Sequence, residues 1–249
     1  MGSAGNVDSG QLSQALDRPQ GLKGVTNPNP ASGGADPATA ADARASAPLN
    51  VLTLGRVVSL EDYQNYALAF AGIAKALATW TWSGRQRGVF LTVAGSSGDV
   101  FNSDDLTLSQ LKTSLWDVGN PYVPIQVASY VPINFEAGAN VLIDQTQYDP
   151  TQVLAQVWQT LSTNFSFAAR QLGQGVALSE IVALIQQTPG VLAVEMTLFN
   201  LQGQPPPPGA PLPPVLLAAS PIAGQQGTPQ GAQMLLLDPA SQGNFEVWS

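Results

Sequence analysis

The chain has 249 residues, of which 44% are hydrophobic and none is cysteine or histidine. This composition supports a proper hydrophobic core, and it excludes disulfides, thiolate zinc sites and mechanisms that need an imidazole or a thiol. Seventeen acidic residues stand against nine basic ones, which gives a net charge of −8, and no lysine or arginine follows Arg170. Because phosphate binding requires clustered cations, we expect no nucleic-acid partner.

Charged residues are scarce, at 10% of the chain, against about 25% in ordinary soluble proteins. A neutral surface is typical of a protein whose neighbours cover much of it, because contact surfaces are depleted of charge. A secreted monomer can have a similar composition, so that alternative stays open.

Residues 1–48 are rich in glycine, proline, asparagine, alanine and serine and have no periodic apolar pattern. This predicts an extended N-terminal arm with little core of its own. Its scattered apolar side chains are expected to fill pockets on the domain or on a neighbouring subunit; they are Val7, Leu12, Leu16, Leu22 and Val25. We see no secretory signal pattern and no apolar stretch near the ~18 residues that span a bilayer.

From Ser59 onwards the sequence alternates between helical and strand patterns. Ser59 and Asp62 have the spacing of a capping box, which predicts a helix that ends at Gly72. Strands are expected at 73–82 and 88–94, joined by a turn at Ser83-Gly84. A second helix is expected at 105–118, capped by Ser103 or Asp104.

Apolar residues alternate from 123 to 135, which predicts one strand. Pro124 and Pro132 have no N–H donor, so we expect this strand at a sheet edge or bulged. Gly138 is expected to turn the chain into a companion strand at 139–144.

Asp149-Pro150 predicts the start of a long helix, with the cap residue before a proline at the first helical position. A short helix at 178–187 and a strand at 191–199 complete the region. The order helix, glycine, strand therefore occurs twice, which leaves two pseudo-repeated subdomains as an open alternative. The predicted fold class is α+β, with mixed or antiparallel sheets packed with helices.

The last part of the chain, 201–249, contains four consecutive prolines, Pro205 to Pro208, and is predicted to be a proline-rich strap. Its apolar runs at 215–217 and 234–237 are expected to dock. Residues 244–248 either form a terminal hairpin with 233–237 or add to a partner's sheet edge. The expected domains are the arm 1–48, an α+β region 49–200 with a subdivision near 120 as an alternative, and the strap 201–249.

Adjacent acids occur at Glu61-Asp62 and Asp104-Asp105. Both pairs lie at expected helix starts, where the helix dipole favours anions, so we interpret them as caps and not as a catalytic pair. The loop 95–99 lacks the lysine of a phosphate loop and the acidic spacing of a calcium loop. We therefore expect no catalytic residue, no cofactor and no metal.

Trp80 and Trp82 lie on one face of an expected strand and are the best candidates for stacking against a sugar. Packing in a core or an interface is the commoner use of such rings. Arg85 and Arg87 flank the neighbouring turn and form the chain's basic cluster. They fit either a contact with an acidic neighbour or a solvated hairpin tip.

A series of short motifs near the front of the chain runs from Val25-Thr26-Asn27-Pro28, through Gly33-Gly34-Ala35-Asp36 and Leu54-Gly55-Arg56, to Ser59–Tyr63. In this order and spacing it resembles the C-terminal part of the baseplate J-like proteins, which form wedges in contractile phage tails and related injection systems. The matching residues, which the resemblance implies are interaction positions, are Asn27, Pro28, Gly33, Gly34, Asp36, Arg44, Gly55, Arg56, Asp62 and Tyr63.

The resemblance implies an α+β wedge protein, present in six copies around a central hub, that helps transmit the trigger for sheath contraction. The implied partners are other wedge subunits, the hub or spike, and sheath or tube proteins. It implies no enzymatic activity, and a location first in the cytoplasm and then in an assembled particle. The alternative from another functional class is a secreted or surface carbohydrate-binding module that uses Trp80 and Trp82.

Overall fold

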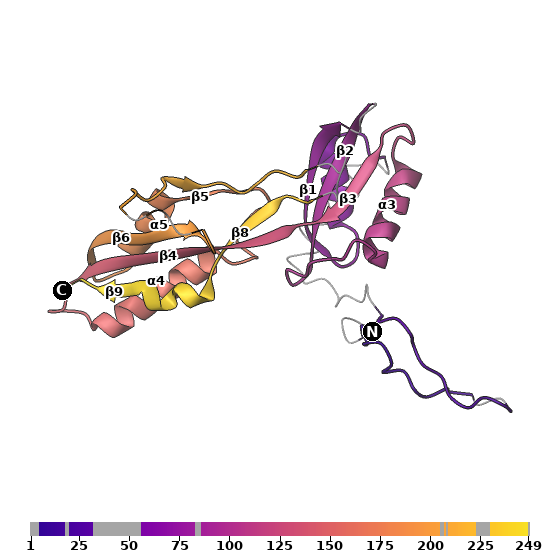
Figure 1. The fold of residues 1–249 in the computed structure, drawn as a ribbon, viewed down its shortest axis with the longest axis horizontal. Helices are drawn as coiled ribbons and strands as arrows, with labels where there is room; N and C mark the ends of the chain where they lie inside the picture. The colour runs from indigo at the N-terminus through magenta and orange to yellow at the C-terminus, as the bar shows by residue number, and fades with distance from the viewer. Residues whose placement is uncertain are drawn as a thin grey trace. The chain divides into compact units, whose positions relative to one another are not determined.

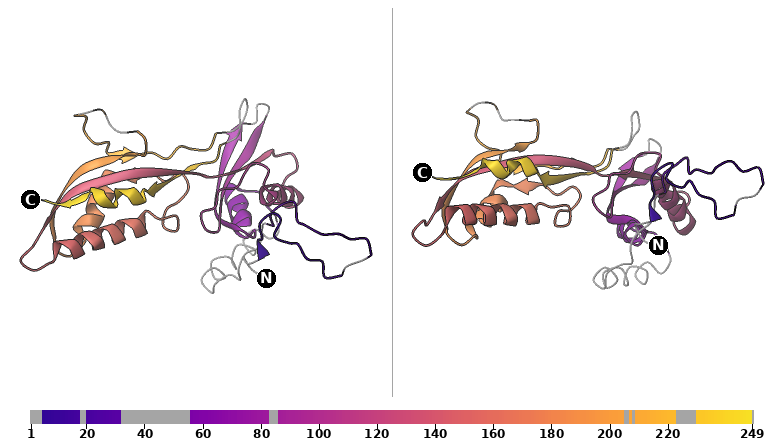
Figure 2. Two further views of the ribbon diagram at one scale, coloured as in Figure 1. Left: turned by 60° about the horizontal axis from the view of Figure 1, so that its bottom comes forward. Right: turned by 90° about the horizontal axis from the view of Figure 1, so that it is seen from below.

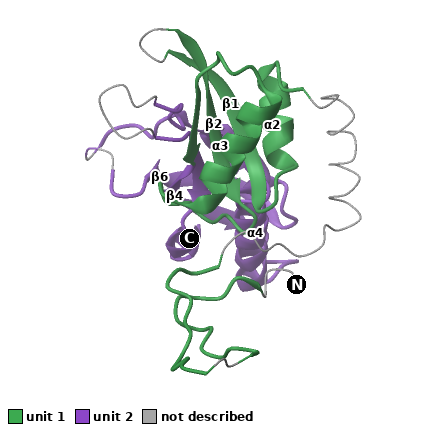
Figure 3. Ribbon diagram, turned by 90° about the vertical axis from the view of Figure 1, so that its right-hand side faces the viewer, with its two compact units in different colours: residues 1–129, 223–229 green, residues 130–222, 230–249 purple. Residues whose placement is uncertain are grey.

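A computed structural model describes residues 5–17, 20–31, 56–82, 86–204, 207, 209–222 and 230–248. The chain divides into two compact units, which Figure 3 colours separately. Unit 1 comprises Met1–Ser129 with Ala223–Pro229, and unit 2 comprises Tyr130–Ile222 with Gln230–Ser249. Both units combine helices with β-sheets, and one sheet in each mixes parallel with antiparallel pairs. The α+β fold class expected from the sequence is confirmed.

Unit 1 contains a three-stranded sheet in the order β1-β2-β3. Strand β1 (Ile73–Trp82) pairs antiparallel with β2 (Arg87–Gly95), and β2 pairs parallel with β3 (Ile125–Ser129). Helix α2 (Leu60–Leu68) precedes β1 (Figure 3), and α3 (Leu106–Val118) connects β2 to β3 (Figure 1). The central strand β2 is buried at every residue after Arg87.

The two helices of unit 1 begin at side-chain caps. Ser59 and Asp62 form the expected capping box at α2. At α3 the cap is Asp105, and not Ser103 or Asp104, because the Asp105 carboxylate accepts a 2.8 Å hydrogen bond from the Thr107 N–H. Both helices pack apolar side chains on the sheet, and their best-buried members are Tyr63, Ala67, Leu108, Leu111 and Leu115.

Unit 2 is organised around one long strand, β4 (Val131–Ile143). It pairs antiparallel with β6 (Val191–Leu201) and parallel with both β8 (Gln233–Leu237) and β9 (Phe245–Val247). A 3-10 helix, η2 (Pro239–Asn244), separates β8 from β9. A small second sheet pairs β5 (Val176–Ala177) with β7 (Val215–Leu216).

Helices α4 (Pro150–Asn164) and α5 (Leu178–Gln186) contribute to the core of unit 2. Helix α4 begins at the expected cap Asp149 and runs alongside β4 in both views of Figure 2. Alternate residues of β4 point into this core, and they are Phe135, Ala137, Ala139, Val141 and Ile143. Phe135 packs edge-on against Phe165 and Phe199.

Arg170 lies buried in unit 2, where its Nη1 donates a 2.9 Å hydrogen bond to Oε1 of Glu180. Its other terminal nitrogen donates to the Gly175 carbonyl, and the guanidinium lies 5.2 Å from the Phe165 ring centroid. The last basic residue of the chain therefore supports the fold.

The predicted strand over 123–135 is wrong, because the chain passes from β3 in one sheet to β4 in another at Tyr130. Strand β3 lies at a sheet edge, as Pro124 suggested, but β4 lies between neighbours. Pro132 is accommodated near the beginning of β4, where β8 pairs with this strand and the pairing with β6 has not yet begun.

The predicted turn at Gly138 is also wrong, since β4 continues through it. A β-carbon at Gly138 would lie 2.9 Å from the backbone oxygen of Asn244. The glycine therefore marks the close approach of another segment.

The terminal hairpin does not form, because β8 and β9 each pair with β4 and not with one another. Between them the Ser241 hydroxyl accepts a 3.3 Å hydrogen bond from the Ala137 N–H of β4. This bond pairs the N–H of Ala137 in the part of β4 that lies between its pairing with β8 and its pairing with β9. The apolar run in β8 docks as expected, since Met234, Leu235 and Leu237 are buried. Of the run 215–217, Leu216 is buried in the core of unit 2, whereas Val215 and Leu217 are exposed.

Candidate interaction surface

Among the predicted interaction residues of the arm, Asn27 has a clear structural role. Its Nδ2 donates to the carbonyl of Asp8 at 2.9 Å, and its Oδ1 accepts from the N–H of Leu12 at 2.9 Å. The carbonyl of the adjacent Pro28 accepts a 2.7 Å hydrogen bond from Ser9. These bonds join residues 8–12 to 27–28, so this pair of residues holds two N-terminal stretches of the chain together.

Five of the predicted positions lie outside the described residues: Gly33, Gly34, Asp36, Arg44 and Gly55. The remaining three, Arg56, Asp62 and Tyr63, come together at the start of α2 in unit 1.

Asp62 stabilises the first turn of α2. Its Oδ2 accepts hydrogen bonds from the N–H groups of Ser59, at 2.8 Å, and Val58, at 3.0 Å. The bond from Ser59 is the main cause that holds the pKa of the Asp62 carboxyl below its usual value, because it favours the charged form. The bonds also fix the backbone of residues 58–59 beside the helix.

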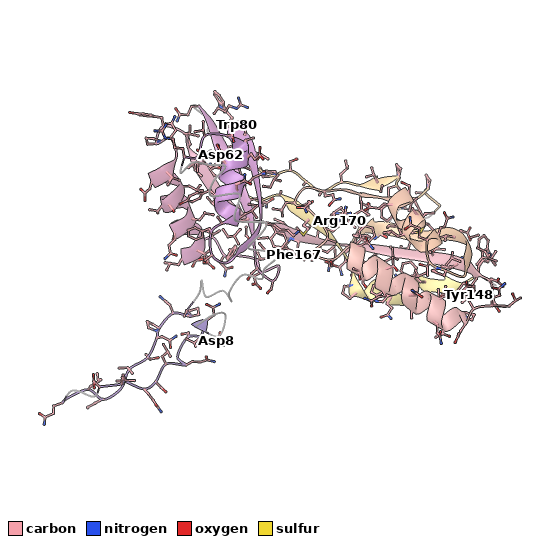
Figure 4. The ribbon with its side chains drawn as sticks, turned by 180° about the vertical axis from the view of Figure 1, so that it is seen from behind. Asp8, Asp62, Trp80, Tyr148, Phe167 and Arg170 are labelled. Atoms are coloured by element: carbon pink, nitrogen blue, oxygen red, sulfur yellow. The ribbon has the colours of Figure 1, made fainter. Side chains whose placement is uncertain are left out.

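A recess of about 300 Å³ opens next to this turn. Tyr63 is buried at the recess, and burial raises the pKa of its phenol. The other walls come from four segments, namely residues 56–58, Trp80 of β1, residues 118–120 at the end of α3, and Val123. Figure 4 labels Asp62 and Trp80, which lie at the same side of unit 1.

Trp80 lines this recess, and Trp82 follows it two residues later at the end of β1; the two residues are 42% and 57% exposed. Both lie on the face of the sheet that carries Val89 and Leu91, which α2 and α3 cover further along. The Arg87 guanidinium lies 4.2 Å from the Trp80 ring centroid, a cation–π contact. Arg85 lies outside the described residues.

Val58 and Tyr122 are two further exposed residues of unit 1. The side-chain amide of Gln86, just before β2, donates a 2.7 Å hydrogen bond to the backbone carbonyl of Tyr122. We call the set Arg56, Val58, Trp80, Trp82 and Arg87 the recess surface. The few residues that contribute most to binding energy at protein interfaces are enriched in tryptophan and arginine. The arrangement therefore fits docking of another protein.

The recess surface was only partly visible in the sequence. The alternation along 73–82 placed both tryptophans on one face, and the motif series included Arg56. Val58 and the Arg87 contact were missed, because the first depends on the fold around α2 and the second on the register of β1 and β2.

Within the described ranges, no group of three or more acidic side chains is placed to hold a metal ion. The helices seen in this part of the chain are all too short or too polar to cross a bilayer.

Residues 55–128 match the family model described as the baseplate J-like central domain. The resemblance read from the sequence is thereby confirmed over these residues. Among solved structures, a chain of the anti-feeding prophage baseplate, determined by cryo-electron microscopy with six-fold symmetry, aligns at 15% identity with a TM-score of 0.49. The alignment covers 90% of the present chain and 47% of the other, so this chain spans about half of that one. The comparison with curated proteins gave no match.

Proposed function

We propose that this chain, whose residues 55–128 match the baseplate J-like central domain, is a structural wedge protein of a contractile injection system or phage tail. The match to that family model carries the proposal. The recess surface supports it, because all of its residues lie between 56 and 87, inside the matched region. A wedge must bind other proteins, and this surface has the side chains for it.

The finer parts of the proposal are the partners and the place in the particle. The chain would help hold the baseplate around the hub in six copies, contact other wedge subunits, hub or spike, and sheath or tube, and help transmit the contraction trigger. Its low charge, at 10% of residues, supports a role in which neighbours cover the surface. We propose synthesis in the cytoplasm, later incorporation into the particle, and no catalytic role.

The exposed tryptophans also favour the carbohydrate-binding alternative. A sugar would need a free aromatic face on which to stack, yet the Arg87 guanidinium already lies 4.2 Å from the Trp80 ring centroid. Trp82 is the more exposed of the two residues, at 57% against 42% for Trp80. We favour protein docking, because a tryptophan–arginine pair beside a recess is typical of interface centres.

The experiment is assembly of particles with the double variant Trp80→Ala/Trp82→Ala. We expect the chain to be reduced at least about tenfold in purified particles relative to the wild type, since loss of central tryptophans weakens interfaces strongly. The matched control is Trp116→Ala, which removes another exposed tryptophan, 47% exposed and contacted by Lys112 on α3. The control should be incorporated normally.

A wild-type chain that never appears in particles, or a double variant incorporated like the wild type, would contradict the proposal. A glycan array that retains the wild type and loses Trp82→Ala would favour the alternative.

A further inference from the structure

The sheet of unit 2 has a second face, opposite to the one that packs on the helices. Residue pairs across the strands bring Glu246 of β9, Asn140 of β4 and Glu195 of β6 into one row on this face. Both glutamates are exposed, and the Asn140 amide donates a 3.4 Å hydrogen bond to Oε2 of Glu195. The row therefore presents two carboxylates to solvent.

Apolar side chains border this acidic row. Leu142, two residues beyond Asn140 on β4, is 39% exposed, and Trp248, two residues beyond Glu246, is 40% exposed. Trp248 is held in place because its N–H donates a 2.8 Å hydrogen bond to the Val141 carbonyl. We call Asn140, Leu142, Glu195, Glu246 and Trp248 the acidic sheet face.

The charge of unit 2 is not balanced by cations of its own. Arg170 is the single basic residue from position 130 to the C-terminus, and it is buried against Glu180. The acidic residues of unit 2 are Glu136, Asp144, Asp149, Glu180, Glu195, Asp238 and Glu246. Cations that pair with the acidic sheet face must therefore come from outside unit 2.

The same chain carries a surface of the required chemistry. The recess surface of unit 1 presents Arg56 and Arg87 next to Trp80 and Trp82, all exposed. It offers cations for the two glutamates and aromatic rings for the apolar border. The two surfaces differ in composition and lie in different units, so the complementarity can be satisfied between two copies.

We propose that the acidic sheet face of one copy docks on the recess surface of a second copy. Arg87 and Arg56 then face Glu195 and Glu246, and the tryptophans pack near Leu142. The contact is heterologous, joining two different surfaces, and repetition of it generates a ring where the rotation closes. This inference names a partner for the recess surface and in that respect rests on the proposed function.

The test uses full-length chains with one surface inactivated at a time. One variant is Arg87→Glu, and the other is Glu195→Arg/Glu246→Arg. Sedimentation velocity at low salt should show self-association of the wild type, and each variant alone should associate at least about tenfold more weakly, because like charges then oppose one another.

An equal mixture of the two variants should recover association, since each contributes the intact surface that the other lacks. Lys112→Glu is the matched control, a charge reversal at a cation that contacts Trp116 outside both surfaces, and it should associate like the wild type. Raising the salt concentration should weaken the wild-type contact.

Crosslinking provides a second readout, because the chain has no cysteine. Arg87→Cys mixed with Glu195→Cys should give a crosslinked dimer, whereas Arg87→Cys mixed with Gln159→Cys, at an exposed position of α4, should not.

A monomeric wild type, a mixture that fails to recover association, or equal crosslinking of both pairs would overturn the inference. If the wild-type chain does not self-associate but is incorporated into particles, and Trp80→Ala/Trp82→Ala lowers that incorporation, the proposed function stands and this inference alone fails.

Discussion

The charged carboxylate of Asp62 accepts hydrogen bonds from backbone N–H groups at the start of its own helix. This predicts that its contribution to stability depends on pH. Replacing it in Asp62→Asn should lower the free energy of unfolding of unit 1 by about 1 kcal/mol at pH 7. The folded-state pKa of Asp62 is lowered, chiefly by the Ser59 N–H. Its contribution is therefore complete above the ordinary aspartate pKa of about 3.9 and is lost as the pH falls through the lowered value.

Denaturant unfolding of both proteins between neutral and acidic pH measures this contribution. The difference between wild type and variant should shrink in acid. Glu61→Gln is the matched control, because Glu61 lies in the same first turn and shares the helix dipole. A control that loses as much stability as Asp62→Asn would show that the helix dipole, and not the capping bond, is responsible.

Sequence spacing was sufficient for the predictions about Asp62 and insufficient for those about Asn27. A capping box depends on residues three apart, so its bonds follow from local geometry. Asn27 bonds to Asp8 and Leu12, which are 19 and 15 positions away, and the motif series gave no indication of these contacts. The contact between the Arg87 guanidinium and the Trp80 ring likewise depends on the register of β1 against β2.

At the scale of elements, Gly138 of β4 lies close to Asn244 at the end of η2. Gly138→Ala places a methyl group 2.9 Å from the Asn244 backbone oxygen and 3.2 Å from the Leu198 β-carbon. Because backbone and a packed side chain must move, the free energy of unfolding of unit 2 should fall by about 1–3 kcal/mol. Thermal and denaturant unfolding monitored by tryptophan fluorescence measure this change.

Gly243→Ala serves as the control for that substitution. Gly243 lies in η2 and has no positive φ, and a methyl group added there would meet no atom within 4 Å. The same chemical change at this position should leave stability unchanged or raise it by less than about 1 kcal/mol. Equal destabilisation by both substitutions would mean that the close approach at Gly138 is not the cause.

The strand patterns predicted which residues are extended but not how the strands pair. Alternation continues through Tyr130 although the chain changes sheets there, because side-chain alternation is the same in any sheet. The sequence likewise showed two apolar strands near the C-terminus. Their pairing with β4 depends on η2 and Ser241, which local pattern does not reveal.

At the scale of the whole molecule, charge is distributed unevenly between the two units. Eight of the nine basic residues precede residue 130, and the one that follows is buried. The number of basic residues in each part of the chain can be read from the sequence. That Arg170 is buried while Glu195 and Glu246 are exposed could be learned only from the fold. The low overall charge therefore includes an exposed acidic face in a unit whose single cation, Arg170, is buried.

The apolar residues form two separate cores, and this predicts that the units respond separately to mutation. One cluster lies between Val57 and Val127 and the other between Ile133 and Val247. Leu111→Ala in the first and Ile181→Ala in the second each remove a side chain that is 0% exposed, and each should cost its own unit about 2–5 kcal/mol. Hydrogen exchange measures the response region by region. Leu111→Ala should accelerate exchange in β2 and leave β4 unchanged, and Ile181→Ala should do the reverse. Equal acceleration in both strands by either substitution would show that the two cores unfold as one cooperative body.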